Sequence, residues 1–375
     1  FVTGATLAPM FNLAGRTGTQ FHKITFQCEH TGSTALEGSA ATVRDLQVED
    51  CVFTGGAQEW VTAINLSWAS GYNRATIKNT SVDATGVGIF IDRPQDTVLY
   101  GVVCTEQGTA GTYGIRLNAS GPFAGEGDTH IVNSRVSGFA EGVVVAGDGC
   151  SVRGSTLQGA DVALTSLGGQ VKVVGCTILV DATTGTTGIR TSGSTLVSDC
   201  YITCNRSSWS GEVPVGVDFL AGTVPSHVSN CVILGFVNGA SGNGVAFPAQ
   251  MGFSSVKGST IQNCGIGVAV AAGSQAMVVS GNIFENTGKG VQVLGLTGAT
   301  TFTHDIVVSG NSFKSCVTQG VYVFGAVSNI SISGNSIDNG LAANIFTPTA
   351  DGIYVGANDT STPVRRVAIE PLKGA

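Results

Sequence analysis

A pattern of six residues returns along the whole chain. Residues 279–284 are VSGNIF, residues 308–313 are VSGNSF and residues 332–337 are ISGNSI. A unit that recurs every 21 to 32 residues predicts a solenoid, in which each copy forms one rung of a coil. The remaining copies are FHKITF (21–26), VEDCVF (48–53), IKNTSV (77–82), LYGVVC (99–104), IVNSRV (131–136), VRGSTL (152–157), VVGCTI (173–178), VSDCYI (197–202), VSNCVI (228–233) and VKGSTI (256–261).

A second pattern follows most of these copies after a gap of variable length. It is a glycine within alternating apolar residues, as in KGVQV (289–293), QGVYV (319–323) and DGIYV (351–355). Alternation with a period of two is typical of strands. Each repeat therefore predicts strand-turn-strand elements joined by loops, and the chain as a whole is predicted to be all-β.

One position in each six-residue copy, which we call the ladder position, holds small or amide-bearing residues. A buried Asn is costly unless it is hydrogen-bonded, but stacking the same residue from successive rungs lets each amide bond its neighbour. We therefore expect Val279, Asn282 and Phe284 to point inward, and Ser280 and Ile283 to point outward. The ladder residues are Cys51, Thr80, Val102, Ser134, Ser155, Cys176, Cys200, Cys231, Ser259, Asn282, Asn311 and Asn335.

The ladder residues and the glycine-containing runs resemble the right-handed parallel β-helix of pectate-lyase-like proteins and phage tailspikes. The resemblance covers nearly the whole chain. It implies a single-stranded right-handed parallel β-helix of about 13 rungs, assembled as a homotrimer. We expect residues 1–20 to form an irregular first rung, residues 21–357 the β-helix, and residues 358–375 an exit segment leading to a separate C-terminal part.

The composition excludes several other classes of protein. Hydrophobic residues make up 42% of the chain and charged residues only 11%, which argues against a disordered or a helical protein. A formal net charge of -7 with scattered Lys and Arg gives no basic surface for nucleic acid or anionic lipid. No apolar run approaches the roughly 20 residues that cross a bilayer, and no signal peptide is visible. No metal or cofactor is predicted, because the five histidines show no metal-ligand spacing and no nucleotide-binding motif occurs.

The ten cysteines are expected to be reduced. Cys176, Cys200 and Cys231 fall at one ladder position on consecutive rungs, where thiols pack as small apolar side chains. Reduced cysteines imply folding in a reducing compartment, here a host-cell cytoplasm in which phage particles assemble.

On a filled coil, function lies on outward strand positions and in long loops. The loop before residue 220 carries Trp209, Glu212 and Asp218, and an aromatic side chain beside two carboxylates suits glycoside cleavage. We predict Glu212 and Asp218 as catalytic residues. The predicted substrate-binding residues are Trp209, Arg190, Arg116 and Asp92.

The same residues also allow a purely structural interpretation. Arg190 with Asp218, and Asp92 with Arg116, are expected on adjacent rungs and so could form ion pairs across them. Outward positions are less polar and less charged after residue 220. The ligand surface is therefore expected on residues 60–220.

The resemblance implies a phage tailspike in the virion tail, which binds a bacterial surface polysaccharide, either capsule or lipopolysaccharide, and cleaves it by hydrolysis. Its partners would be two further copies of itself and other phage tail proteins. One alternative is a non-catalytic adhesin or structural spike with the same coil. A second is a polysaccharide lyase, which is less favoured because Asp92, Arg116, Arg190 and Asp218 do not reproduce the calcium-binding acidic cluster of pectate lyases.

Overall fold

The computed structural model describes the chain in two compact units, residues 1–193 and 194–375. The described residues are 9–30, 32–55, 58–67, 71–106, 111–118, 128–180, 186–204, 213–220, 225–237, 241–295, 303–338, 345–346, 353–356 and 359–360. In this part of the chain the regular structure is entirely β, and none of it forms a helix with the length and hydropathy needed to cross a bilayer.

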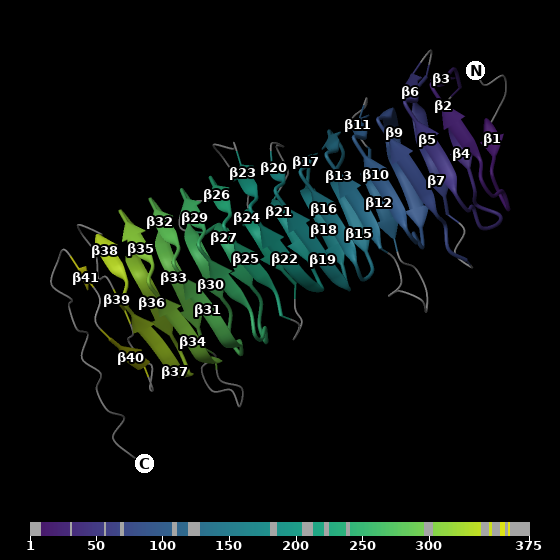
Figure 1. Cartoon of the computed structure of the whole chain (residues 1–375). Helices are drawn as coiled ribbons and strands as arrows, with labels where there is room; N and C mark the ends of the chain where they lie inside the picture. Colours follow the sequence, from purple (N-terminus) through teal and green to yellow (C-terminus); the bar gives the residue numbers. More distant parts are fainter. Residues whose placement is uncertain are drawn as a thin grey trace. The chain divides into compact units, whose positions relative to one another are not determined.

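In the first unit every rung runs through three parallel sheets, which we call sheets 1, 2 and 3 in chain order (Figure 1). Sheet 1 contains β2 (Gln20–His22), β5 (Leu46–Glu49), β8 (Ala75–Lys78), β10 (Thr97–Tyr100), β13 (Thr129–Val132), β16 (Cys150–Arg153) and β19 (Gln170–Val174). Sheet 2 contains β3 (Thr25–Cys28), β6 (Val52–Gly55), the start of β9 (Ser81–Asp92), β11 (Val103–Glu106), β14 (Arg135–Ser137), β17 (Thr156–Gly159) and β20 (Thr177–Val180).

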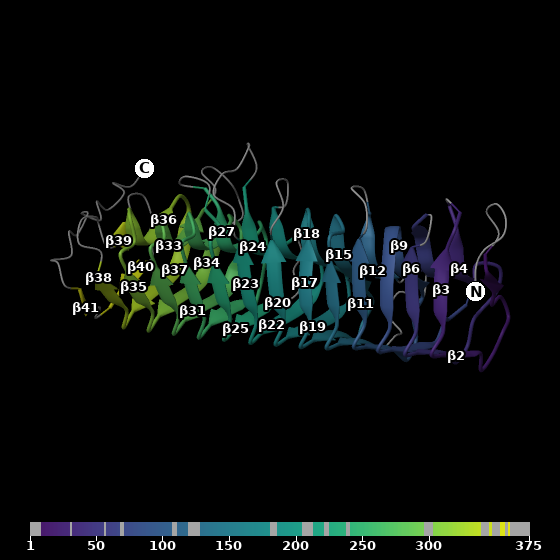
Figure 2. The ribbon, with the colours of Figure 1, turned by 90° about the horizontal axis from the view of Figure 1, so that it is seen from above.

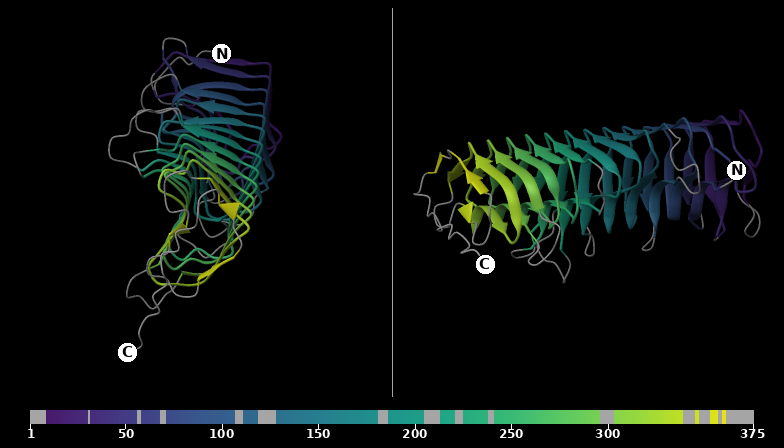
Figure 3. Two further views of the ribbon diagram at one scale, coloured as in Figure 1. Left: turned by 90° about the vertical axis from the view of Figure 1, so that its left-hand side faces the viewer. Right: turned by 90° about the horizontal axis from the view of Figure 1, so that it is seen from below.

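Sheet 3 of the first unit is the sheet of the glycine-containing runs. It contains β1 (Phe11–Asn12), β4 (Thr34–Glu37), β7 (Trp60–Leu66), the end of β9, β12 (Tyr113–Asn118), β15 (Glu141–Ala146), β18 (Val162–Leu167) and β21 (Thr187–Thr191). Its strands β9, β12, β15 and β18 lie side by side (Figure 2). In the left panel of Figure 3 the purple and blue strands of this unit lie over one another, as expected for stacked rungs.

The second unit repeats the same three sheets. Sheet 1 contains β22 (Ser194–Ser198), β25 (His227–Ser229), β28 (Ser255–Lys257), β31 (Gln275–Ser280), β34 (Thr303–Ser309), β37 (Val327–Ser333) and β40 (Ile353–Val355). Sheet 2 contains β23 (Tyr201–Cys204), β26 (Val232–Leu234), β29 (Thr260–Gln262), β32 (Ile283–Glu285), β35 (Ser312–Lys314), β38 (Ser336–Asp338) and β41 (Asp359–Thr360). Sheet 3 contains β24 (Val215–Phe219), β27 (Asn243–Phe247), β30 (Ile266–Val270), β33 (Lys289–Leu294), β36 (Gln319–Phe324) and β39 (Ile345–Phe346).

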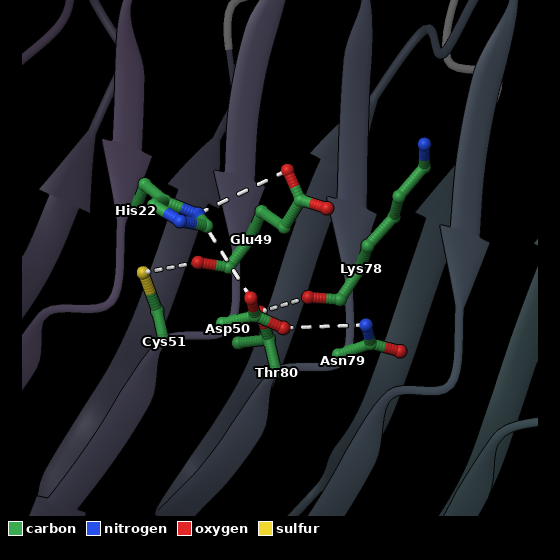
Figure 4. Close-up of polar contacts among 7 residues, drawn as sticks. All are labelled: His22, Glu49, Asp50, Cys51, Lys78, Asn79 and Thr80. Carbon is green, nitrogen blue, oxygen red and sulfur yellow. Dashed lines mark hydrogen bonds and ion pairs between the residues drawn. The ribbon is translucent and has the colours of Figure 1, made fainter.

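Each of the thirteen six-residue copies is a strand, a two-residue bend and a second strand within the described residues. The bend joins sheet 1 to sheet 2, and its first residue has a left-handed backbone, as Asp50 (φ 53°) and Asn79 (φ 47°) do. Its second residue is the ladder residue. Where that residue is Cys, Ser or Thr, its side chain donates to the carbonyl two residues back: Cys51 Sγ donates to Glu49 O at 3.3 Å and Thr80 Oγ1 to Lys78 O at 2.8 Å (Figure 4). Small polar residues recur there because they close this bend from inside.

The Asn ladder of the second unit forms as predicted. Asn282, Asn311 and Asn335 are each 1% exposed, and their side-chain oxygens accept from the backbone N–H of the preceding ladder residue at 2.9, 2.9 and 3.0 Å. The predicted alternation is confirmed as well. Val279 and Phe284 are completely buried, whereas Ile283 is 38% exposed.

Inside each unit, equivalent side chains of successive rungs stack on one another. The rings of Phe26 and Phe53 stack with centroids 4.5 Å apart in the first unit, and those of Phe284 and Phe313 stack at 4.9 Å in the second. This packing explains the glycine of the second sequence pattern. A Cβ at Gly290 would lie 2.3 Å from the Phe313 ring and 2.6 Å from the backbone oxygen of Gly320, so no larger residue fits there without displacement.

All ten cysteines are free thiols, and every one is buried. Their burial agrees with the expectation that these thiols pack as small apolar side chains. Burial raises the pKa of Cys264 to about 12, and that of Cys150 and Cys316 to about 11.

Asp92, expected to bind substrate, is only 4% exposed, and its role stays a prediction. One sequence expectation is wrong in detail. The DGIYV run does not add a strand to sheet 3, since Tyr354 lies on β40 in sheet 1. The expected limits of the β-helix, 21–357, stay a prediction, although the strands β1 and β41 outside them pair with β4 and β38.

Candidate functional site

The outer face of sheet 3 carries half-exposed polar and aromatic side chains, among them Tyr113, Arg116 and Glu141 in the first unit. Parallel pairing sets equivalent residues of neighbouring rungs about 4.8 Å apart, so the side chains form columns. One column in the first unit holds Phe90, Arg116, Val144 and Thr165 in register, and a second holds Tyr113, Glu141 and Val162.

Arg116 contacts two aromatic rings in the first unit. Its guanidinium carbon is 5.4 Å from the ring centroid of Phe90 and 4.6 Å from that of Tyr113. All three side chains are half-exposed, and the Arg116 Nε is buried without a hydrogen-bond partner among the described residues. We call these three residues the Arg116 cluster. It offers a flat aromatic surface together with guanidinium N–H donors.

A carboxylate stands next to the Arg116 cluster. Glu141 is in register with Tyr113, is half-exposed, and accepts a 2.6 Å hydrogen bond from Thr165 Oγ1. Further along the same face, an Arg190 terminal nitrogen donates to Thr187 Oγ1 at 3.3 Å. This face thus combines aromatic rings, a guanidinium, a carboxylate and hydroxyl groups, which is the set of groups that holds a sugar.

The second unit carries a comparable group on β33 and β36, which we call the Lys289 cluster: Lys289, Gln292, Gln319, Tyr322 and Phe324. Lys289 Nζ lies 4.2 Å from the ring centroid of Tyr322 and donates to Gln292 Oε1 at 3.0 Å. The rings of Tyr322 and Phe324 are parallel within 8°, with centroids 6.2 Å apart. Desolvation by burial lowers the pKa of Lys289 below its ordinary value.

The structure describes only some of the site residues that the sequence predicts. Trp209 and Glu212 lie outside the described residues, so their role stays a prediction. Asp218 lies on β24, half-exposed and in register with Ala246. Arg190 belongs to the first unit and Asp218 to the second, so the expected ion pair between them also stays a prediction.

Asp92 and Arg116 lie on adjacent rungs as expected, but they are not register partners. Arg116 is in register with Phe90, and Asp92 stands opposite Asn118. The Asp92 carboxylate accepts a 3.0 Å hydrogen bond from Arg93 N, and its backbone oxygen accepts one of 2.7 Å from Asn73 Nδ2. Asp92 therefore supports the end of β9 instead of facing solvent.

Sequence reasoning missed Glu141, Lys289 and Gln319. Each immediately precedes the glycine of a glycine-containing run, whereas the predicted residues Arg116, Arg190 and Asp218 are each the second residue after it. The missed position points outward as well, since both residues of each register pair Tyr113 with Glu141 and Lys289 with Gln319 are half-exposed. The signal was thus present in the residue before the glycine.

No group of three or more His, Cys, Asp or Glu side chains is arranged to hold a metal ion in the described ranges.

The comparisons with known proteins agree with the architecture. The family profile described as "Right handed beta helix region" matches residues 123–307 and 216–366, together more than half of the chain. No curated protein matches the sequence.

Solved structures of similar fold include three phage tailspikes. The Dettilon tailspike protein aligns with a TM-score of 0.50 at 13% identity, over 84% of this chain and 62% of its own. Tailspike protein 3 of bacteriophage CBA120 aligns at 0.48 and 13% identity, over 91% and 57%. A variant tailspike of Escherichia coli bacteriophage HK620, in complex with a pentasaccharide, aligns at 0.40 and 12% identity, over 90% and 58%. The chain spans about three fifths of the length of these structures.

Proposed function

The chain belongs to the right-handed β-helix family, and from this premise we propose that it is a phage tailspike that binds a bacterial surface polysaccharide on the outer face of sheet 3. The Arg116 cluster is the observation that carries the proposal. An apolar ring face, an arginine with an unsatisfied buried Nε and the neighbouring Glu141 carboxylate suit a ligand with C–H faces and many hydroxyls.

The shared fold of the Dettilon tailspike, at a TM-score of 0.50, supports the tailspike assignment. Under this proposal the protein acts in the virion tail as a homotrimer beside other phage tail proteins. The proposed ligand is either capsular polysaccharide or lipopolysaccharide.

Binding is tested with the purified trimer or full-length protein against capsular polysaccharide and lipopolysaccharide from a panel of bacterial strains. At least one polysaccharide should bind, and Arg116→Ala should weaken that binding by about tenfold or more, because it removes a charged donor and its ring contacts. Arg135→Ala is the matched control, since Arg135 is exposed on β14 in sheet 2. Absence of binding across the panel would overturn the proposal.

Hydrolysis of the bound polysaccharide is proposed on Glu212 and Asp218. A general acid and a base or nucleophile are what glycoside cleavage needs, and removing either typically costs about 100-fold or more in turnover. Release of reducing ends should therefore fall by at least about that factor in Glu212→Gln and in Asp218→Asn. Binding without any release would instead favour a non-catalytic adhesin, and activity unchanged in both variants would exclude this pair.

A further inference from the structure

We propose that the Lys289 cluster on β33 and β36 is a binding site for a carboxylate-bearing sugar, a uronic acid, in which the ring stacks on Tyr322 and Phe324 and the carboxylate meets Lys289. This rests on the proposed function and deepens it by naming the class of sugar unit.

Within the described residues, the charge of Lys289 has no protein counter-ion. Its ammonium contacts the Tyr322 ring and the uncharged Gln292 oxygen, and no carboxylate pairs with it among the described residues. An ammonium has three donors, of which one is used by Gln292. A half-buried cation in this position is stabilised by an incoming anion, and the lowered pKa of Lys289 indicates that desolvation of the charge is not offset in the unliganded protein.

The aromatic surface beside Lys289 is partly exposed at Phe324. Phe324 is 38% exposed, and its ring is parallel to that of Tyr322 one outward position earlier on the same strand. Lys289 and Gln319, and Gln292 and Tyr322, are register partners on adjacent strands, so charge, amides and rings come together on one face. A pyranose has an apolar face that stacks on such rings, while its substituents point to the side where the ammonium and amides lie.

Gln319 supplies a hydrogen-bonding group that is not yet used. Among the described residues its Oε1 is buried and has no hydrogen-bond partner, although the side chain as a whole is half-exposed. An unsatisfied buried oxygen is energetically unfavourable. A sugar hydroxyl that draws this amide outward therefore gains a hydrogen bond without breaking one.

A neutral sugar would use the rings and Gln319 but would leave Lys289 uncompensated. The geometry therefore favours an acidic unit over a neutral unit of the same shape. This preference is the part of the proposal that a measurement can isolate.

The test compares acid and ester forms of the same oligosaccharides. Calorimetry with tetragalacturonate and with a hyaluronan tetrasaccharide, each also as its methyl ester, is run on the full-length protein. We expect at least one acid to bind about tenfold or more tightly than its ester. Lys289→Met, which keeps the apolar stem over Tyr322, should remove that difference, while Lys314→Met, an exposed lysine on β35, should leave it intact.

Tyr322→Leu gives a second measurement. It should weaken the binding of the acid and of the ester alike, because it removes the stacking surface. Failure of both acids to bind, equal binding of acid and ester, or an unchanged preference in Lys289→Met would overturn the inference. If whole bacterial polysaccharide still binds in a manner sensitive to Arg116→Ala, this inference fails alone; if no polysaccharide binds at all, the proposed function fails.

Discussion

The side-chain nitrogen of Asn282 donates a 3.0 Å hydrogen bond to the side-chain oxygen of Asn311 on the next rung, and Asn311 donates an equal bond to Asn335. Each amide also bonds backbone of the preceding rung: Asn311 Nδ2 reaches Val279 O at 2.9 Å. The ladder thus satisfies polar atoms that would otherwise be buried without partners, and it holds successive bends in register.

Asn311→Asp should strongly destabilise the protein. An aspartate at this buried site cannot donate to Val279 O or to the Asn335 oxygen, and it places a charge beside both acceptors. A loss of about 3–5 kcal/mol is expected, as for other uncompensated buried charges. Asn311→Ser should cost less, about 1–3 kcal/mol, because serine closes the equivalent bend at Ser155 and Ser259.

Both Asn311 variants are measured by urea unfolding, with Asn286→Asp as control. Asn286 is exposed and left-handed (φ 52°), a conformation that aspartate tolerates, so the control should change stability by less than about 0.5 kcal/mol. Equal stability of Asn311→Asp and Asn286→Asp would mean that the ladder does not contribute as argued.

The fold could be predicted from the sequence because its determinants are local and repeated. Asn282, Asn311 and Asn335 occupy one position in near-identical six-residue copies, and each accepts a hydrogen bond from the backbone N–H of the ladder residue on the preceding rung. A period of two within each copy then fixes which side chains point inward, as Phe284 and Ile283 show.

The candidate site was less predictable because it depends on register between rungs and on the reach of long side chains. The expected partner of Arg116 was Asp92, but parallel pairing places Phe90 beside it and Asp92 two residues away. Lys289 extends to the ring of Tyr322 on the next strand, a contact that no spacing along one strand reveals. Variable loops between sheets 2 and 3 hide this register from the sequence.

Gly290→Ala should destabilise the second unit by about 1–3 kcal/mol, as overpacking of a filled core usually does. The new methyl would meet the Phe313 ring at 2.3 Å and the backbone oxygen of Gly320 at 2.6 Å. A double-mutant cycle with Phe313→Leu, measured by urea unfolding, checks the cause. The double variant should lose less stability than the sum of the single variants, and strict additivity would show that the ring is not the obstacle.

The cysteines should be unreactive in the folded protein. Burial raises the pKa of Cys104, Cys150, Cys264 and Cys316, so their thiolate fraction at pH 8 is small. A hydrogen bond from Cys200 lowers the pKa of Cys231, but that thiol is only 1% exposed. Titration with a thiol-exchange reagent should label fewer than about one cysteine per native chain and all ten after denaturation. Rapid labelling of several native thiols would contradict the buried ladder positions.

Lowering the pH should destabilise the second unit through protonation of His227. Burial, followed by the charge of Lys257, lowers the pKa of this histidine below its ordinary value of 6.5. The unfolded chain therefore binds the proton more readily than the folded chain, so the stability that His227 contributes is present above pH 6.5 and is lost as the pH falls through the folded pKa. The thermal midpoint should drop between pH 8 and pH 5, and it should drop less in His227→Gln, whose amide can keep the 2.9 Å hydrogen bond to Ser255 Oγ. Carboxylates that titrate in the same range affect both proteins alike, so an identical drop in the two would show that His227 does not contribute.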